Sequence, residues 1–251
     1  MADIADLEAA LRAIGEPRWL GARGRVKAVT DSTMDDAWQA LEDGADHGFV
    51  VVADHQRAGR GSHGRTWASP AGVDLYLSAV VRIPRPRPTM TLATALAVVD
   101  TVRGALGESG AEVRVKWPND VLVDDRKIAG ILCESRSRGA RFDAVIGVGL
   151  NVNRASFEPV LEATSLHLAS GHDVDRGEVL SRLLSAMERW LAAEPSAVTA
   201  ALDDALAWRG ERVSCDAIAG ELLGVAADGG LRLRTDDGER VLHAGRLSRA
   251  T

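Results

Sequence analysis

The chain has 251 residues, 46% of them hydrophobic and 26% charged, and its 30 Lys and Arg against 36 Asp and Glu give a formal net charge of −6. This composition is sufficient for a sizeable core, and its acidic balance disfavours a protein that coats nucleic acid or binds anionic membranes. Two cysteines are too few for a disulfide framework, and the first residues lack the order of a signal peptide. The longest uncharged apolar stretch, residues 88–99, is shorter than the roughly 18 residues of a membrane span. We therefore expect a cytoplasmic protein.

The first part of the chain predicts helices and strands around one long glycine-rich stretch. Apolar residues at helical spacing predict the first helix, and Asp31, Ser32 and Thr33 can cap a second helix that ends near Gly44. In chain order, the predicted elements are a helix at 4–14, a strand at 25–30, the helix after Thr33, a strand at 49–53, the glycine-rich stretch 54–72, a strand near 75–79 and a long helix at 89–106.

The second part predicts strands at 113–117, 121–123, 127–134 and 142–148, and then helices around 179–190 and 197–208. Runs of strands followed by runs of helices indicate an α+β fold with a mainly antiparallel or mixed sheet. After Arg209, short apolar runs separated by Asp-Gly turns predict a small β unit, which is too small to hold a core alone. We therefore expect a main domain of residues 1–208 and a small C-terminal domain of residues 209–251.

A run of glycines and arginines follows the strand predicted at 49–53, and it reads Gly59-Arg60-Gly61-Ser62-His63-Gly64-Arg65-Thr66-Trp67. It satisfies G-x-G-x-x-G and nearly satisfies the P-loop pattern, but both motifs require a helix directly afterwards, and here Pro70 and a predicted strand follow. Glycines let backbone N–H groups approach an anion, and arginines bind carboxylate or phosphate oxygens in pairs. We interpret the run as an anion-binding loop; the alternative is a solvated arginine loop.

Two of the chain's three lysines lie close together further along. Lys116 begins the stretch Lys116-Trp117-Pro118-Asn119-Asp120, and Lys127 begins Lys127-Ile128-Ala129-Gly130-Ile131-Leu132. Pro118 ends the strand, so Asn119 and Asp120 stand where polar side chains can project into a pocket. A single strand lysine is usually solvated, but this chain uses arginine for nearly every other cation. The pair of lysines therefore indicates a need for ammonium groups.

A third stretch, Gly147-Val148-Gly149-Leu150-Asn151, ends another predicted strand. Glycines in a strand admit a ligand at close range, and Asn151 can read a nucleobase or ribose edge, although a satisfied turn residue is the alternative. The six histidines show no metal-ligand spacing, and the sequence has no Gly-x-Ser-x-Gly nucleophile elbow. An anion-binding loop with two lysines and no nucleophile favours activation of a carboxylate by ATP over hydrolysis.

Together, these stretches closely resemble the biotin protein ligase family. The resemblance is carried, in the family's order, by Asp31-Ser32-Thr33, Gln56, the loop from Gly59 to Trp67, the Lys116 and Lys127 stretches, and Gly149-Leu150-Asn151. It implies an α+β catalytic domain of the class II synthetase type, followed by a small SH3-like C-terminal barrel. Only one predicted helix precedes residue 25, so we expect the monofunctional type without a DNA-binding domain.

The resemblance implies an ATP-dependent ligase. Such an enzyme joins biotin and ATP into biotinyl-5′-adenylate, releases pyrophosphate, and passes biotin to one lysine of a biotin carboxyl carrier domain. Mg²⁺ is expected to arrive with ATP, near Asp120, without a side-chain metal cluster, and no redox cofactor is expected. The expected partners are biotin, ATP and the carrier domain, but neither DNA nor a membrane. A lipoate-type ligase of the same fold and a non-enzymatic biotin or nucleotide sensor are the alternatives.

The resemblance also implies roles for single residues. Lys127, Arg65, Lys116 and Asp120 are expected to be catalytic, with Lys127 between the biotin carboxylate and the α-phosphate. The residues expected around biotin are Ser32, Thr33, Met34, Gln56, Gly59, Arg60, Gly61, Ser62 and Lys127. Those expected around ATP and the adenylate are Arg60, Ser62, Arg65, Trp67, Ala68, Asn119, Asp120, Lys127 and Asn151. Ser62 stands where the family has a second arginine, which predicts weaker retention of the intermediate.

Overall fold

The computed structural model describes residues 4–14, 18–158 and 161–250. Its main feature is a seven-stranded sheet with the order β1-β2-β3-β7-β6-β5-β4. β1 runs parallel to β2, and the other neighbouring strands pair in antiparallel fashion, so the sheet is mixed and the α+β prediction is confirmed. The strands are β1 (Gly24–Thr30), β2 (Val50–Gln56), β3 (Leu75–Ile83), β4 (Val113–Lys116), β5 (Asp120–Val123), β6 (Arg126–Arg138) and β7 (Arg141–Leu150).

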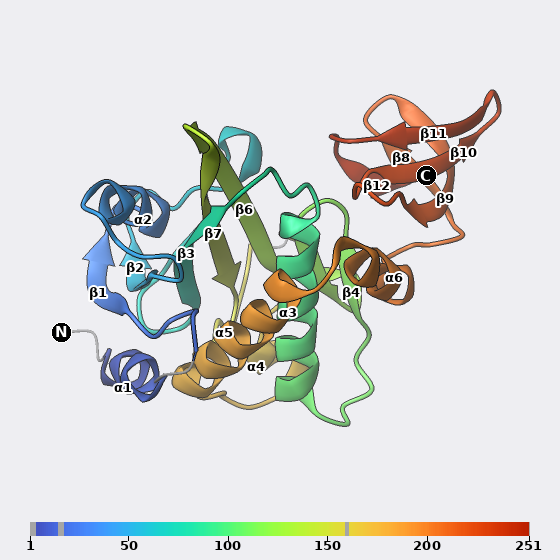
Figure 1. Ribbon diagram of the computed structural model, residues 1–251. Helices are drawn as coiled ribbons and strands as arrows, with labels where there is room; N and C mark the ends of the chain where they lie inside the picture. The colour runs from blue at the N-terminus through green and yellow to red at the C-terminus, as the bar shows by residue number, and fades with distance from the viewer. Residues whose placement is uncertain (1–3, 15–17, 159–160, 251) are drawn as a thin grey trace.

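Helices cover both faces of this sheet (Figure 1). α3 (Met90–Leu106) and α5 (Arg176–Ala192) share a core with Val50 and Val52 of β2, whereas α2 (Thr33–Glu42) packs with Val51 on the opposite face. Successive side chains of a strand point to opposite faces, so the continuous apolar run of β2 fits a strand that is covered on both sides. α3 is apolar on nearly all sides because it contacts both α5 and the strands β4 to β6.

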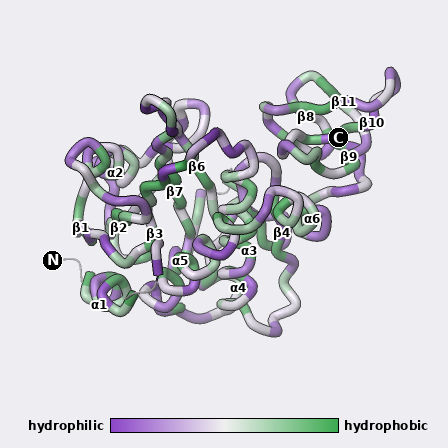
Figure 2. The backbone as a smooth tube through the Cα atoms, in the orientation of Figure 1, coloured by the Kyte–Doolittle hydropathy of each residue, from purple (hydrophilic) through white to green (hydrophobic). Residues whose placement is uncertain are grey.

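Figure 2 shows the same division along the chain, with hydrophobic stretches in the central strands and in α3. The remaining helices are α1 (Ala5–Ala13), α4 (Leu166–Ser170) and α6 (Pro195–Ala205), and the loop after β2 contains the short 3₁₀ helix η1 (Ser62–Gly64). None of the described helices has the length and apolar character that a bilayer span requires.

The start of α2 confirms the predicted cap. Ser32 has an extended backbone, and its hydroxyl accepts a hydrogen bond of 3.3 Å from the backbone N–H of Met34. An N-cap serine satisfies one of the amide groups that a helix start leaves free, so the sequence itself fixes where this helix begins. As a result, Thr33 and Met34 occupy the first turn of α2. They lie at the end of the sheet where β2 leads into the segment of residues 57–72, which contains the run from Gly59 to Trp67 and is called the glycine-arginine loop below.

The C-terminal residues form a second sheet of five antiparallel strands, in the order β11-β10-β9-β8-β12. Its edge strands β11 and β12 do not pair with each other in the described chain, so the expected SH3-like barrel is not closed. This second sheet packs against the main domain. Trp117 Nε1 donates a hydrogen bond of 3.0 Å to the carbonyl of Gly229, and the buried leucines of the second sheet belong to the main hydrophobic core. The division between residues 208 and 209 stays a prediction. The strands are β8 (Arg212–Cys215), β9 (Ile218–Val225), β10 (Leu231–Thr235), β11 (Gly238–Leu242) and β12 (Leu247–Arg249).

Candidate functional site

A cavity of about 380 Å³ lies where the glycine-arginine loop crosses the ends of β6 and β7. It brings together most of the predicted site residues, although they are spread from α2 to the segment after β7. Those that line it are Ser32, Thr33, Met34, Gln56, Arg60, Gly61, Ser62, Arg65, Trp67, Ala68, Asn119, Lys127 and Asn151. Gly59, Lys116 and Asp120 do not line it. At Gly59 a Cβ would lie 2.5 Å from the Trp67 carbonyl oxygen, so this glycine lets the loop close on itself.

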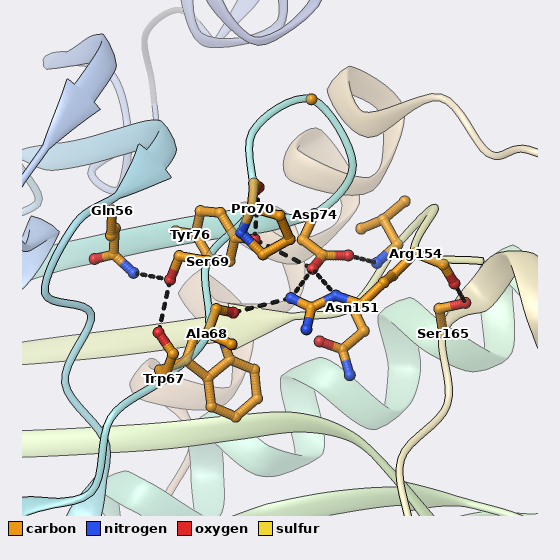
Figure 3. Close-up of polar contacts among 12 residues, drawn as sticks. Gln56, Trp67, Ala68, Ser69, Pro70, Asp74, Tyr76, Asn151, Arg154 and Ser165 are labelled. Atoms are coloured by element: carbon orange, nitrogen blue, oxygen red, sulfur yellow. Dashed lines mark hydrogen bonds and ion pairs between the residues drawn. The ribbon is translucent and has the colours of Figure 1, made fainter. Parts of the chain in front are cut away.

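The α2 end of the cavity is a buried chain of polar groups. Gln56 Oε1 accepts hydrogen bonds from the backbone N–H and the hydroxyl of Thr33, at 2.9 and 3.1 Å, and the Ser78 hydroxyl donates to Thr33 Oγ1 at 2.8 Å. On its other side, Gln56 Nε2 donates to Ser69 Oγ at 2.8 Å (Figure 3). These bonds fix the amide of Gln56 in one orientation. This end of the cavity is therefore polar, neutral and rigid before any ligand arrives.

The loop tip carries the cations of the cavity mouth. Arg60 forms ion pairs with Asp35 of α2 at 3.1 Å and with Glu134 of β6 at 3.2 Å. Arg65 instead folds back on the loop itself, where its guanidinium donates to the carbonyl and hydroxyl oxygens of Ser62 at 3.2 and 2.9 Å. Arg65 is largely exposed and pairs only with neutral oxygens in the described chain, so its charge is free for an anion.

Lys127 stands at the centre of the cavity, where β6 begins. Its Nζ lies 2.6 Å from Asp120 Oδ1 and 5.3 Å from the centroid of the Trp67 ring. The ring lies against Gly130 of β6 and Gly149 of β7, which are register partners. A Cβ on either glycine would come within 2.9 Å of ring atoms. The two strand glycines therefore create the space that Trp67 fills. Close approach was predicted for Gly149, as a strand glycine of the third stretch, but not for Gly130.

Two asparagines stand at strand ends on the far side of Lys127. Asn119 Nδ2 donates to the carbonyl of Ile131 at 2.9 Å, and Asn151 Nδ2 donates to the carbonyl of Thr164 at 2.9 Å. Each amide is thus anchored through its nitrogen while the residue lines the cavity. An anchored side-chain amide can present its remaining groups to a ligand in a fixed direction.

Lys116, at the end of β4, lies outside the lining of the cavity. Its Nζ is 5.2 Å from the centroid of the Trp208 ring. Burial lowers the pKa of Lys116 below the ordinary lysine value; the negative charge of Asp120 opposes this effect, and the positive charges of Arg246 and Lys127 reinforce it. Burial is thus the main cause of the lowered pKa, and Arg246 and Lys127 are the cations close enough to add to it.

Several lining residues were not predicted, namely Arg154, Phe157, Leu161 and Ala163, from the segment between β7 and α4, and Arg246, which precedes β12. The guanidinium of Arg154 forms an ion pair with the fully buried Asp74 and also donates to the carbonyl of Ala68 at 2.9 Å (Figure 3). No motif marks this segment, and no single residue of the C-terminal sheet was assigned to the site from the sequence.

Comparison with known proteins identifies the family. The sequence model of the biotin/lipoate A/B protein ligase family matches residues 26–151. A biotin–[acetyl-CoA-carboxylase] ligase of Paracoccus denitrificans is 34% identical over 235 residues, which cover 86% of this chain and 96% of that protein. The chain belongs to the biotin/lipoate A/B protein ligase family. The resemblance to biotin protein ligases noted in the sequence is thereby confirmed.

Other relatives in the family match over part of their length. A biotin–[acetyl-CoA-carboxylase] ligase of Mycobacterium tuberculosis is 41% identical over 68% of this chain and 66% of that protein. A bifunctional ligase/repressor of Bacillus subtilis is 37% identical over 64% of this chain, and the match spans only 51% of the relative. Among solved structures, the biotin protein ligase of Aquifex aeolicus in complex with biotin and ATP superposes with a TM-score of 0.78 and 26% identity, over 91% of this chain and 99% of that one.

Proposed function

We propose that this protein activates biotin with ATP to biotinyl-5′-adenylate and transfers the biotin to a lysine of a biotin carboxyl carrier domain. The observation that carries the proposal is the single cavity that has a neutral polar end at α2, a lysine at its centre and two anchored asparagines beyond it. An amide-like ring, a carboxylate and a nucleotide fit these three parts in that order. The names of the Paracoccus denitrificans and Aquifex aeolicus relatives support the same substrates.

The α2 end would bind the ureido ring of biotin. A ureido group has N–H donors and one carbonyl acceptor but no charge, so it matches hydroxyl and amide partners better than charged ones. Ser32, Thr33 and Gln56 supply such partners from buried positions. Met34 and Leu132 add apolar surface for the hydrocarbon part of the ligand. Because the Gln56 amide is already held by Thr33 and Ser69, binding requires little reorganisation.

At the centre, Lys127 would join the two substrates. The carboxylate oxygen of biotin attacks the α-phosphorus, and the bond to the bridging oxygen of pyrophosphate breaks. Both reactants are anions, so fixed positive charge must offset their repulsion. Lys127, with Arg60 and Arg65 from the loop, provides that charge at the cavity. Asp120 holds the Lys127 ammonium in place at 2.6 Å until the substrates arrive.

The far end would bind the nucleotide, with Trp67, Ala68, Asn119 and Asn151 around the adenylate. Lys116 does not line the cavity, and it would stabilise the leaving phosphates through its nearby positive charge. Mg²⁺ would supply further charge neutralisation on the phosphates when it is bound with ATP. Asp120 fits such an ion, because a single carboxylate suits a cation that keeps most of its ligands from phosphate and water. The described chain contains no group of three or more His, Cys, Asp or Glu side chains that could hold a metal by itself.

Transfer would complete the reaction. The amine of the acceptor lysine attacks the acyl carbon of the adenylate, AMP leaves, and the new bond is an amide. We assign the acceptor to a carrier domain of a biotin-dependent carboxylase, because the Paracoccus denitrificans relative is a ligase of that kind. A cytoplasmic location, the lack of a DNA or membrane partner and the lack of a redox cofactor remain predictions.

The deciding experiment is incubation of the protein with ATP, Mg²⁺, biotin and a biotin carboxyl carrier domain, followed by mass measurement of the acceptor. We expect a gain of one biotinyl group that requires ATP and is absent when the acceptor lysine is replaced by arginine. A lipoyl gain in a parallel reaction with lipoate, without a biotinyl gain, would instead assign the lipoate-type activity. Biotin binding without pyrophosphate release would indicate a sensor and refute the proposal.

A further inference from the structure

A buried ion pair between Asp74 and Arg154 lies beside the nucleotide end of the cavity. Asp74 precedes β3 and is 0% exposed, while Arg154 follows β7 and lines the cavity. Arg154 Nε donates to Asp74 Oδ2 at 2.8 Å, and a second guanidinium nitrogen makes a closer contact with the same oxygen. Neither residue belongs to a motif of the sequence or has a role in the activity proposed above.

The pair connects three segments that meet at the cavity (Figure 3). Asp74 Oδ1 accepts a hydrogen bond of 2.9 Å from the backbone N–H of Val152, next to Asn151. Arg154 Nη2 donates to the carbonyl of Ala68 at 2.9 Å, next to Trp67 in the glycine-arginine loop. The Tyr76 hydroxyl lies within hydrogen-bond distance of both Asp74 Oδ2 and the carbonyl of Pro70, at 3.1 and 3.0 Å. The two charged side chains therefore hold residues 67–70 of the loop against the end of β7.

The position of the pair argues for more than stability. Burying two charges costs desolvation energy, and a well-packed apolar pair in the same space is often at least as stable. An apolar pair, however, cannot form the hydrogen bonds that Arg154 donates to the carbonyl of Ala68 and that Asp74 accepts from the backbone N–H of Val152. The loop also has a second support, because Asp54 accepts the backbone N–H of Gly72 and pairs with Arg176 of α5. Residues 67–72 are thus braced from buried positions, whereas the side chain of Arg65, nearer the tip, donates its hydrogen bonds to Ser62 of the same loop.

We propose that Asp74 and Arg154 are positioning residues that set the distance between Trp67–Ala68 and Asn151, and so keep the nucleotide end of the cavity in its binding shape. The inference rests on the proposed function and deepens it. The hydrogen bonds among Thr33, Gln56 and Ser78 at the α2 end do not involve the pair, whereas the bond of Gln56 Nε2 to Ser69 Oγ joins this end to residues 67–70. Disturbing the pair therefore weakens nucleotide binding more than biotin binding, because Thr33 still holds the amide of Gln56.

The test uses the full chain with three variants, Arg154→Gln, Arg154→Lys and Asp74→Asn. Arg18→Gln is the matched control, because Arg18 also joins a partly buried carboxylate, Glu188 at 2.9 Å, and a hydroxyl, Ser185 at 2.7 Å, but does not line the cavity. Calorimetry measures the Kd for biotin alone. A second titration, with biotin present, measures the Kd for an ATP analogue with a methylene group between its α- and β-phosphorus atoms, which cannot react. Biotin-dependent pyrophosphate release gives kcat and KM for ATP, and thermal unfolding gives Tm.

We expect Arg154→Gln and Asp74→Asn to raise the analogue Kd and the KM for ATP about tenfold or more, while the biotin Kd changes less than about threefold. Arg154→Lys keeps the charge opposite Asp74, but a single ammonium cannot reproduce the planar fork that reaches both Asp74 and Ala68, so it restores little of the loss. Arg18→Gln is expected to lower Tm without changing either Kd.

Four outcomes overturn the inference. The first is an analogue Kd within about threefold of wild type in folded Arg154→Gln and Asp74→Asn. The second is a parallel weakening of biotin binding and analogue binding. The third is that none of the three variants folds, which assigns the pair to stability alone. Full restoration by Arg154→Lys would show that charge, and not the link to Ala68, is what matters, and would also overturn it. Absence of pyrophosphate release by the wild type refutes the proposed function instead, and the binding titrations separate the two failures.

Discussion

Lys127 and Asp120 form an ion pair in which Nζ and Oδ1 lie 2.6 Å apart and both side chains are mostly shielded from solvent. A cation held in this way is preorganised, because its position does not have to be created at the moment when charge develops on the phosphate. The pair also fixes how much room the cation has. A Cβ at Gly130 would lie 3.4 Å from Lys127 Nζ, and the centroid of the Trp67 ring is 5.3 Å from the same atom.

We expect Lys127→Arg to reduce adenylate formation nearly to background, although the charge is kept. A compact ammonium fits between two oxygens in this space, whereas a broad planar guanidinium does not. Biotin-dependent pyrophosphate release measures the effect. The matched control is Lys27→Arg, since Lys27 pairs with Asp36 at 2.8 Å outside the cavity and should tolerate the exchange. Adenylation by Lys127→Arg within about threefold of wild type would contradict the bridging role.

Ser62→Arg is expected to slow release of the adenylate in the absence of an acceptor. A charged hydrogen bond is worth ~1.5–3 kcal/mol, or about ten- to more than a hundredfold in dissociation, and a serine hydroxyl recovers only part of this. Ser62 lines the cavity, whereas the adjacent His63 is exposed and does not line it. His63→Arg therefore adds the same charge without reaching the ligand and serves as the control. Equal or faster release by Ser62→Arg, in a trap assay for free adenylate, would refute the idea.

Gly149→Ala is expected to lower adenylate formation about tenfold or more. The new Cβ would lie 2.4 Å from Trp67 Cε2, so the ring has to leave its place at the cavity, and crowding of this kind costs ~1–3 kcal/mol. Gly104→Ala in α3 is the control, because a Cβ there would meet the flexible end of Arg182, at 3.2 Å, and no other group of the described chain beyond its own helix backbone. Pyrophosphate release measures both variants. Wild-type rates for Gly149→Ala would show that the position of the ring is unimportant.

We expect the alkaline fall of kcat/KM for ATP to follow the deprotonation of Lys116. Burial holds the pKa of Lys116 below the ordinary lysine value of 10.5, so its ammonium loses a proton at lower pH than a free lysine does. As pH rises through that lowered pKa, the positive charge of Lys116 beside the cavity disappears, and we expect kcat/KM for ATP to fall. In Lys116→Arg the cation stays protonated, so the fall should move to higher pH. An unchanged alkaline limb in this variant would assign the titration to another group.

The C-terminal sheet is expected to affect ATP use more than biotin binding. Deleting residues 209–251 tests this only coarsely, because it also removes the carbonyl partner of Trp117. Arg246→Ala is sharper, since Arg246 lines the cavity and its charge acts on Lys116. We expect a higher KM for ATP with a biotin Kd like that of wild type. Arg234→Ala, in the same sheet but paired with Glu221 at 2.7 Å, should change neither, and an unchanged KM in Arg246→Ala would exclude the role.

Much of the fold and site could be predicted because local patterns carry it. The cap at Ser32, the order of the strands along the chain and the lysines at β4 and β6 are consequences of residues close together in sequence. The parallel pairing of β1 with β2 could not be predicted, since the alternation of side chains is the same in both kinds of ladder. α4 and β12 were missed because elements of five and three residues are too short to show a period.

The missed site residues share a different cause. Asp74 and Arg154 are eighty positions apart, and only the pairing of β3 with β7 brings them together. An aspartate before a strand is usually solvated, so its burial depends on a partner that the sequence does not mark. Arg246 reaches the cavity because the C-terminal sheet packs on the β4 side of the main sheet, through Trp117. Such long-range placement is a property of the assembled core.

The scarcity of lysine has a consequence for the chemistry proposed above. An acyl-adenylate reacts with any free amine, so an enzyme that makes one is exposed to modification by its own product. Of the three lysines here, Lys27 is paired with Asp36 and Lys127 with Asp120, while Lys116 is packed beside Trp208. Arginine, which occupies nearly all other cationic positions, stays protonated and is not acylated under these conditions. The enzyme therefore offers an escaping adenylate few lysine amines, and each of them is engaged by a carboxylate or an aromatic ring.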